Sequence, residues 1–237
     1  MLLDKVRELL SMDVNELARK IDHTLLKPTA SFKDIERICN EAIKYNFIAC
    51  YVSPCYVEYA YKMLKGSEVK LGSVIAFPHG NTSIDCKVNE AKWLVEHNVD
   101  EVDMVINLGA VKSGNFKIIE EEVSRVAEVV HEYGAILKVI IESGLLTNEE
   151  KIEVVRVLIK AKADFVKTST GFIGPGANIH DVYFLKRVSN GKLKVKAAGG
   201  IRHALDALML IAVGADRIGT STGVQIIEEF KFMKKLI

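Results

Sequence analysis

Short runs of β-branched and apolar residues alternate with longer amphipathic segments from residue 20 to the end of the chain. In the longer segments the apolar residues recur at helical spacing, as at Ile35, Ile38 and Ala42, so each predicted helix has one buried face. The short runs predict strands. These predicted strands are residues 20–25, 47–52, 70–77, 101–107, 137–142, 165–170, 194–198 and 217–220.

Several helix ends are also readable. Residues 31–34 and 147–150 have the spacing of a capping box, in which a hydroxyl side chain and an acidic one bond each other's backbone amides. Ser53 followed by Pro54 predicts a cap with proline at the first helical position, and Gly134 suits a helix end. The helices are therefore expected to lie between the strands.

Eight strand and helix units in 237 residues predict a single parallel (β/α)8 barrel, the TIM-barrel fold. An open doubly wound sheet would be expected to carry a Gly-x-Gly-x-x-Gly turn after its first strand, and this chain has none. No segment rich in Pro, Gly or Ser divides the chain. We expect one domain over residues 1–237, with residues 1–19 as a helical prefix.

Composition and charge narrow the possible functions. The chain has 32 Lys and Arg against 31 Asp and Glu, and no basic block, so nucleic-acid binding is not expected. Charges interrupt the first ten residues and no apolar run reaches bilayer length, so neither a signal peptide nor a membrane partner is expected. We expect a cytoplasmic protein whose phosphate ligand, if it has one, is a small molecule.

Cysteines and histidines do not predict a cofactor. The four cysteines do not form a disulfide framework or a Cys-x-x-Cys pair, and the six histidines are scattered without the spacing of metal ligands. We therefore expect no bound metal.

Three lysines lie within predicted buried strands: Lys138, Lys167 and Lys196. An isolated buried ammonium is costly, so each must find a partner, reach water or lose its proton. A single strand lysine is usually half of an ion pair, or has a buried stem and a charged end in water. In a barrel, however, the strands' carboxyl ends share one mouth, and Asp103 is expected to face the same interior.

Two lysines that converge would change each other's chemistry. Two ammonium groups about 4 Å apart repel by roughly 4 kcal/mol at an effective dielectric near 20, which corresponds to about three pKa units. One amine would then be neutral, able to attack a carbonyl and form an imine that accepts electrons from a breaking carbon–carbon bond. A nearby carboxylate such as Asp103 would transfer protons.

Two glycine-rich turns follow the last two predicted strands, at residues 198–202 and 219–223. Barrels commonly bind phosphate in the loops after strands seven and eight, through backbone N–H groups and a helix N-terminus. Gly171, which follows the sixth strand, is placed to join them. The same residues also make ordinary turns, so their position carries the information.

Motifs over most of the chain resemble the deoxyribose-phosphate aldolase family, class I aldolases of the (β/α)8 fold. These motifs are residues 21–26, 101–107, 137–142, 163–171, 195–202 and 217–222. The resemblance implies that Lys167 forms a Schiff base with acetaldehyde, that Lys196 lowers the pKa of Lys167, and that Asp103 transfers protons with water. The implied reaction is reversible cleavage of 2-deoxy-D-ribose 5-phosphate to D-glyceraldehyde 3-phosphate and acetaldehyde, without a metal.

The resemblance also implies further site residues. Asp22 and Lys138 correspond to supporting polar residues, and Cys50 to a cysteine near the substrate cavity. The implied contacts to phosphate and substrate are Thr170, Gly171, Gly199, Gly200, Gly219, Ser221 and Thr222.

Two departures from the family pattern stand out. Phe172 replaces a lysine that some members carry after the Thr-Ser-Thr-Gly motif, and the sequence ends at Ile237 without the terminal tyrosine of others. Two other functions stay open: another Schiff-base aldolase of phosphorylated aldehydes, and a non-catalytic barrel that binds sugar phosphates. The family also implies a homodimer or homotetramer.

Overall fold

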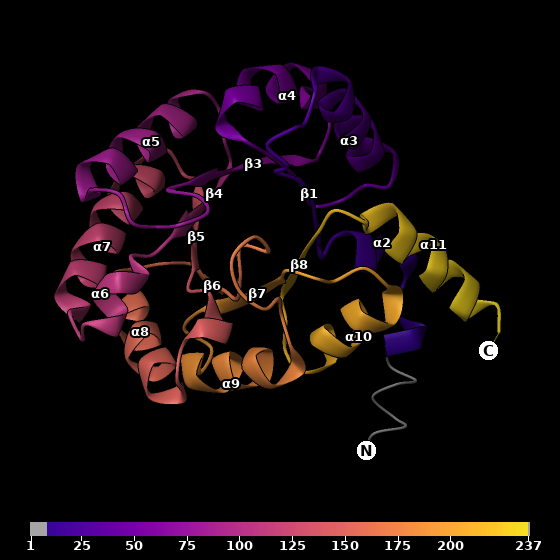
Figure 1. Cartoon of the computed structure of the whole chain (residues 1–237). Helices are drawn as coiled ribbons and strands as arrows, with labels where there is room; N and C mark the ends of the chain where they lie inside the picture. Colours follow the sequence, from indigo (N-terminus) through magenta and orange to yellow (C-terminus); the bar gives the residue numbers. More distant parts are fainter. Residues whose placement is uncertain (1–8, 237) are drawn as a thin grey trace.

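A computed structural model describes residues 9–236 of the chain. Its strands form a closed parallel barrel at the centre of a ring of helices (Figure 1). The strands are β1 (Ile21–Leu25), β2 (Ala49–Val52), β3 (Lys70–Ile75), β4 (Glu101–Val105), β5 (Ile136–Ile140), β6 (Phe165–Lys167), β7 (Lys194–Ala198) and β8 (Arg217–Thr220). Each strand pairs with its neighbours in chain order, and β1 pairs with β8 to close the barrel. The predicted (β/α)8 fold is confirmed.

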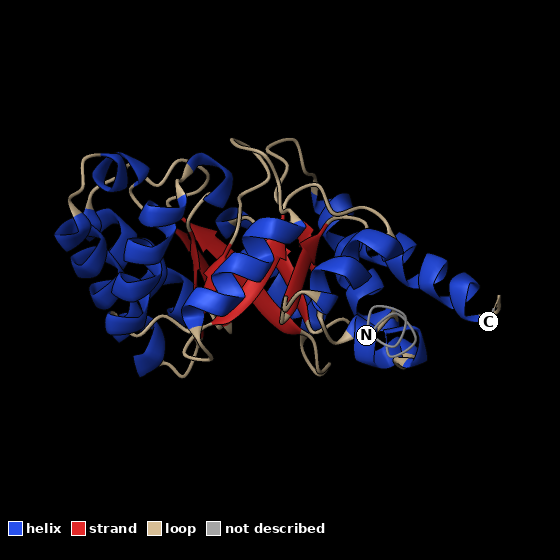
Figure 2. Cartoon of the chain, turned by 90° about the horizontal axis from the view of Figure 1, so that it is seen from below, coloured by secondary structure: helices blue, strands red, loops and turns tan. Residues whose placement is uncertain are grey.

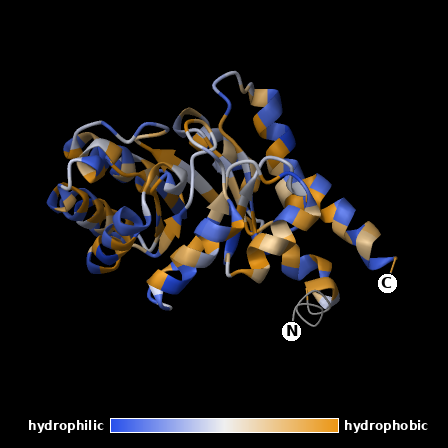
Figure 3. Cartoon of the chain, turned by 60° about the horizontal axis from the view of Figure 1, so that its bottom comes forward, coloured by the Kyte–Doolittle hydropathy of each residue, from blue (hydrophilic) through white to orange (hydrophobic). Residues whose placement is uncertain are grey.

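The helices lie outside the strands (Figure 2). They are α2 (Val14–Ala18), α3 (Phe32–Lys44), α4 (Val57–Leu64), α5 (Ile84–Glu96), α6 (Leu108–Lys112), α7 (Phe116–Glu132), α8 (Asn148–Lys160), α9 (Ile179–Ser189), α10 (Ala204–Ala212) and α11 (Gly223–Lys234), with short 3₁₀ turns η1 (Pro54–Tyr56) and η2 (Ser143–Leu145). Most carry hydrophilic and hydrophobic stripes along their length (Figure 3). No helix within residues 9–236 is long and apolar enough to cross a membrane.

Of the predicted helical prefix over residues 1–19, residues 1–8 lie outside the described residues. Within the described part, α2 begins after Asp13, whose side chain accepts a hydrogen bond from the Asn15 amide. It buries Leu17 and packs beside α11, next to it in Figure 1. This contact ties the two ends of the described chain together.

The predicted helix ends are mostly correct. Both capping boxes are present, Ser31 with Asp34 at α3 and Thr147 with Glu150 at α8. Gly134 follows α7 with a φ of 70°, as a helix end requires. Ser53 is the N-cap residue and Pro54 the first helical residue, as predicted, but the Ser53 side chain makes no capping bond and the element that begins at Pro54 is a 3₁₀ turn.

The predicted strands 70–77, 101–107 and 165–170 extend too far at their carboxyl ends, where the observed strands stop at residues 75, 105 and 167. Ala76 has a φ of 50°, which ends β3, and the Thr170 amide donates to the Glu142 carboxylate instead of the ladder. β-Branched residues favour extended backbone whether or not a partner strand is present.

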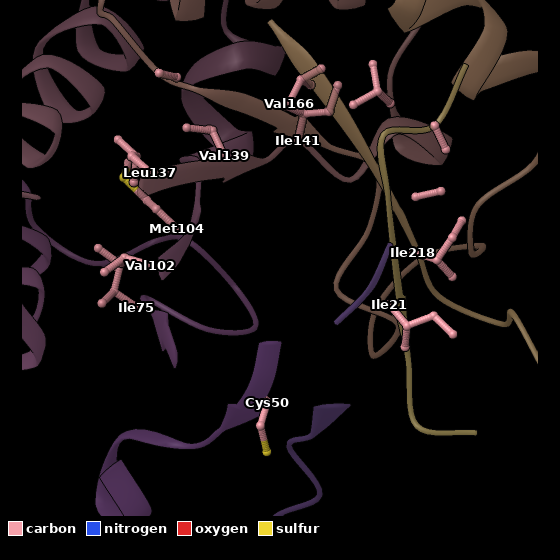
Figure 4. Packing of buried hydrophobic residues seen from close by; sticks show 14 of the residues in the cluster. Ile21, Cys50, Ile75, Val102, Met104, Leu137, Val139, Ile141, Val166 and Ile218 are labelled. Carbon is pink, nitrogen blue, oxygen red and sulfur yellow. The ribbon is translucent and has the colours of Figure 1, made fainter. Parts of the chain in front are cut away.

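Alternate residues of each strand face two different layers. Most of the residues facing the helices are apolar and form the main hydrophobic core, as Val102, Met104, Leu137 and Val139 show in Figure 4. Their neighbours in sequence face the barrel interior, where Asp103 pairs with Lys138 across β4 and β5. The fold thus separates an apolar outer layer from a charged inner one.

Candidate active site

Asp103 lies at the centre of the charged inner layer. Its Oδ2 accepts hydrogen bonds from Lys167 and from Lys196, with both Nζ atoms at 2.7 Å. The Lys196 Nζ also lies 2.7 Å from Asp22 Oδ2. Lys167 and Lys196 are register partners on β6 and β7, which brings their ammonium groups to the same oxygen. The predicted convergence of Asp103, Lys167 and Lys196 is therefore present in the structure.

The surroundings give the two lysines opposite properties. Burial lowers the pKa of Lys167, Asp103 partly counters this and Lys196 adds to it, so that the pKa of Lys167 is about 8. Burial also lowers the pKa of Lys196, but Asp103 and Asp22 outweigh it and raise the value. Near neutral pH, Lys196 is an ammonium, whereas about a tenth of Lys167 is already a free amine.

Asp103 stays ionised between them. Burial alone would raise the pKa of Asp103, but Lys167, Lys196 and Lys138 hold it well below its usual range. Its Oδ1 has no hydrogen-bond partner among the described residues, and the Lys138 Nζ lies 3.9 Å from it. An acceptor is therefore free on the carboxylate that already binds Lys167.

A second group of charged residues lies beside these, and the sequence analysis missed most of it. Lys138 donates to the Tyr51 hydroxyl and to Glu101. Arg217 donates from Nε to Asp22 at 2.9 Å and from Nη2 to Glu101 at 2.5 Å. Glu101 could have been found, because it shares the inward face of its strand with Asp103. Arg217 could have been found as a charge on a predicted buried strand.

A cavity of about 330 Å³ opens above Lys167, at the carboxyl ends of the strands. Lys167 is 3% exposed, whereas Asp103 is fully buried beneath the cavity. The cavity is lined by most of the residues predicted for phosphate and substrate, namely Thr170, Gly171, Gly199, Gly200, Gly219 and Ser221. Its wall also includes Lys27 and Arg202, which were not among the predicted site residues.

Glycine is required on this wall for two reasons. Gly171, Gly199 and Gly200 have φ values of 79°, 94° and 77°, which side chains rarely tolerate. The loop before α9 also presses on the loop after β7, since a Cβ on Gly176 would lie 2.2 Å from the Gly199 carbonyl oxygen. The two loops are thus fixed against each other at the edge of the cavity.

Phe172 forms part of the mouth. It lines the cavity, is 49% exposed, and packs edge-on against Phe77 with ring centroids 5.2 Å apart. An apolar side chain thus occupies the position where some family members carry a lysine, while Lys27 and Arg202 supply positive charge elsewhere on the cavity.

Two predicted residues do not face the cavity. Thr222 is the residue before α11; its amide donates to the Thr220 hydroxyl and its hydroxyl to the Arg202 carbonyl. Cys50 is buried in the outer apolar layer (Figure 4). Its sulfur lies 4.0 Å from that of Cys39 on α3. Successive strand residues point to opposite faces, so Tyr51 takes the inward position.

The fold and the site together define an enzyme with an amine at the floor of a barrel mouth. The chain belongs to the DeoC/LacD family of aldolases, whose family model matches residues 17–229. It is similar to deoxyribose-phosphate aldolase of Aciduliprofundum boonei, with 47% identity over 94% of this chain and 100% of that protein. The similar enzyme of Thermococcus kodakarensis is 48% identical, over 92% of this chain and 98% of its own.

Solved structures agree with these relatives. The deoxyribose phosphate aldolase of Aeropyrum pernix, described as having a unique tetrameric structure, superposes with a TM-score of 0.91 and 34% identity. The match covers 98% of this chain and 99% of that one. The protein is therefore an aldolase, a carbon–carbon lyase.

Proposed function

We propose that this aldolase reversibly cleaves 2-deoxy-D-ribose 5-phosphate to D-glyceraldehyde 3-phosphate and acetaldehyde through a Schiff base on Lys167. The observation that carries the proposal is the shared Asp103 oxygen, which binds both a lysine of lowered pKa at the cavity floor and a charged lysine beneath it. The named relatives support the choice of substrate.

Lys167 supplies the nucleophile. Its neutral amine adds to the aldehyde carbon of the open-chain sugar, and loss of water gives an iminium ion. When the hydroxyl on the third carbon loses its proton, the bond between the second and third carbons breaks and its electrons move to the iminium nitrogen. Glyceraldehyde 3-phosphate leaves, the remaining enamine is protonated on carbon, and water releases acetaldehyde and restores the amine.

Asp103 and Lys196 support these steps from below. Asp103 is within hydrogen-bond reach of the Lys167 nitrogen, at 2.7 Å, so it can accept and return the protons of imine formation. Lys196 remains charged, disfavours protonation of Lys167 and keeps Asp103 ionised. Asp22, Lys138, Glu101 and Arg217 hold this pair in position.

The phosphate is proposed to bind where the loops after β6, β7 and β8 meet. Backbone amides at Gly171, Gly199 and Gly200 suit an anion, as does the N-terminus of α11, which starts at Gly223. Lys27 and Arg202 add positive charge to the same wall. They compensate for the absence of a lysine at position 172.

The remaining expectations extend this proposal to the whole protein. We propose that the chain is one barrel domain with residues 1–19 as a prefix, that it works in the cytoplasm, and that it forms a homodimer or homotetramer. The description of the Aeropyrum pernix relative as a tetramer supports assembly. Light scattering of the purified protein during gel filtration measures the assembly directly, and a monomer would contradict it.

Two measurements test the reaction. Turnover of 2-deoxyribose 5-phosphate is followed by coupling the released glyceraldehyde 3-phosphate to a dehydrogenase. Borohydride reduction in the presence of acetaldehyde, followed by peptide mass mapping, locates the imine. We expect an ethyl group on Lys167; an adduct on a different lysine, or turnover without any adduct, would refute the mechanism. Lys167→Arg is the control, since it keeps the charge and forms no imine.

A further inference from the structure

Tyr51 is a fully buried aromatic residue inside the barrel, next to the residues of the proposed reaction. On β2 it is the register partner of Thr24 on β1 and of Gly72 on β3. Its hydroxyl donates to Glu101 at 3.0 Å and accepts a hydrogen bond from Lys138. Two hydrogen bonds thus hold the Tyr51 hydroxyl in place, and Tyr51 itself is not among the residues that line the cavity.

Gly72 provides the space that the Tyr51 ring occupies. A Cβ added at Gly72 would lie 2.4 Å from the ring carbon Cζ of Tyr51, closer than any real contact. The backbone of Gly72 does not require glycine, because its φ is not positive. Its lack of a side chain is explained by the ring across from it.

The face of the Tyr51 ring is directed at Lys196. The Lys196 Nζ lies 3.7 Å from the ring centroid, well within the range of a cation–π contact. The same ammonium bonds Asp103 and lies beside Asp22, so the ring and two carboxylates enclose it. Both groups are buried, and a cation–π contact between desolvated groups is stronger than one at a surface.

We propose that Tyr51 is a positioning residue for the reaction, because the face of its ring holds the Lys196 ammonium beside Asp103 and Lys167. This rests on the proposed role of Lys167 as the imine-forming amine. With the ring in place, Lys196 stays close and charged, and it opposes protonation of Lys167. Without the ring, that opposition weakens and Lys167 needs a higher pH to lose its proton.

Other charged groups also act on Lys196 and Lys167, and the test must separate them from Tyr51. They come from the other strands of the barrel and are Asp22 on β1, Glu101 and Asp103 on β4, Lys138 on β5, and Arg217 on β8. A variant at Tyr51 should therefore change the ring and leave each of these charges present.

The first experiment compares Tyr51→Phe with Tyr51→Met. Phenylalanine keeps the ring face and loses the hydroxyl, whereas methionine fills much of the volume without a π face. The acidic limb of the pH profile is the part in which kcat/KM rises as Lys167 loses its proton. We expect this limb to move to higher pH by about one unit in the methionine variant and to stay in place in the phenylalanine variant. An unmoved limb in the methionine variant, or equal shifts in both, would overturn the proposal.

Phe165→Leu is the matched control. Phe165 is also a buried ring on an inward strand position, but its nearest ammonium groups are Lys138 at 5.3 Å and Lys194 at 5.5 Å from the centroid. Its loss is expected to leave the acidic limb unchanged. A shift equal to that of Tyr51→Met would mean that any cavity in the barrel has this effect, and would also overturn the proposal.

A second experiment does not depend on how a methionine variant folds. Position 51 is filled with phenylalanine and then with phenylalanines carrying increasing numbers of fluorine atoms, which weaken the negative ring face with little change of shape. The acidic limb should move to higher pH with each added fluorine, and a limb that stays at the same pH throughout the series would refute the role of the ring. Borohydride trapping on the unmodified protein separates the two proposals. If no adduct forms at Lys167, the proposed mechanism is refuted. If the adduct forms but the acidic limb does not move in the variants, only the role of Tyr51 is refuted.

Discussion

Lys167 occupies the boundary between the buried ion network and the open cavity, and its position determines how the reaction should depend on pH. Its pKa is lowered from 10.5 to about 8, first by burial. Below that value the free amine falls about tenfold for each pH unit. We therefore expect kcat/KM to rise with pH up to about 8 and then level off. The profile is measured with buffers of constant ionic strength; a flat profile from pH 6 to 9 would contradict the assignment.

Asp103 affects Lys167 in the opposite direction from burial, which gives a second prediction at the scale of single residues. Asp103 raises the pKa of Lys167, and its effect is larger than that of Lys196. Asp103→Asn should therefore move the acidic limb to lower pH, because the ammonium loses its partner. The plateau of kcat should nevertheless fall by about 10²–10⁴-fold, since the proton-transferring group is gone.

These two effects of Asp103→Asn can be separated. Full pH profiles of kcat and kcat/KM distinguish a displaced limb from a lowered plateau, and circular dichroism verifies that the variant is folded. A limb displaced to higher pH would show that Asp103 does not stabilise the Lys167 ammonium. A plateau unchanged within about twofold would remove Asp103 from proton transfer.

At the scale of elements, the order of strands and helices was predictable because burial leaves a period in the sequence. The same alternation correctly placed Asp103, Lys167 and Lys196 on inward faces. It gives no answer at β2, where Cys50 and Tyr51 are both fully buried, so polarity does not tell the inward residue from the outward one. Lys27 and Arg202 lie in loops, whose conformation has no period from which their direction could be predicted.

Helices α5 and α7 are joined by two ion pairs of very different burial, which gives a prediction about stability. Lys87 and Glu122 are buried, with N and O atoms 2.6 Å apart, and Lys87 also donates to the Val105 carbonyl at the end of β4. Lys87→Met would leave the Glu122 carboxylate buried without its cation, and we expect a loss of about 3–5 kcal/mol in the free energy of unfolding. Urea denaturation measures it.

The second pair between the same helices is the control. Arg125 and Asp85 are 2.8 Å apart, but their side chains are 43% and 77% exposed. Arg125→Met should change the free energy of unfolding by less than about 1 kcal/mol, because water screens the pair. Lys87→Met combined with Glu122→Leu should be more stable than Lys87→Met alone. Equal losses for the buried and exposed pairs would contradict this account.

At the scale of the whole molecule, the barrel assembles charges from strands far apart in the sequence. Within residues 9–236, its central layer contains the acidic side chains of Asp22, Glu101 and Asp103 and the basic side chains of Lys138, Lys167, Lys196 and Arg217. Three acidic side chains thus lie among four basic ones, so basic groups outnumber acidic groups by one in this layer. A net charge in a dry interior is costly, so the barrel as a whole favours loss of the Lys167 proton. Among these basic residues it is Lys167, which lines the cavity, that has the lowered pKa and loses its proton.

The mouth of the barrel has the opposite charge requirement, because it must attract an anion. Arg202 and Lys27 come from loops at β7 and β1, on the wall that the phosphate is proposed to contact. Arg202→Gln should raise KM for 2-deoxyribose 5-phosphate by about tenfold, equivalent to about 1.4 kcal/mol, with a smaller change in kcat. Lys27→Gln should act in the same direction, and both effects should shrink as salt rises, since the two side chains are exposed.

Unphosphorylated 2-deoxyribose distinguishes anion binding from a general disturbance of the mouth. It offers the same aldehyde to Lys167 without the phosphate, so Arg202→Gln should leave its kcat/KM within about twofold of the unmodified protein. Lys160→Gln is the charge-matched control, because Lys160 is an exposed residue at the end of α8 that pairs with Glu120. Equal losses on both substrates would assign Arg202 to the shape of the loop after β7. A loss confined to the phosphorylated substrate would place the anion between the loops after β7 and β1, above the Lys167 amine, whose pKa its buried surroundings lower.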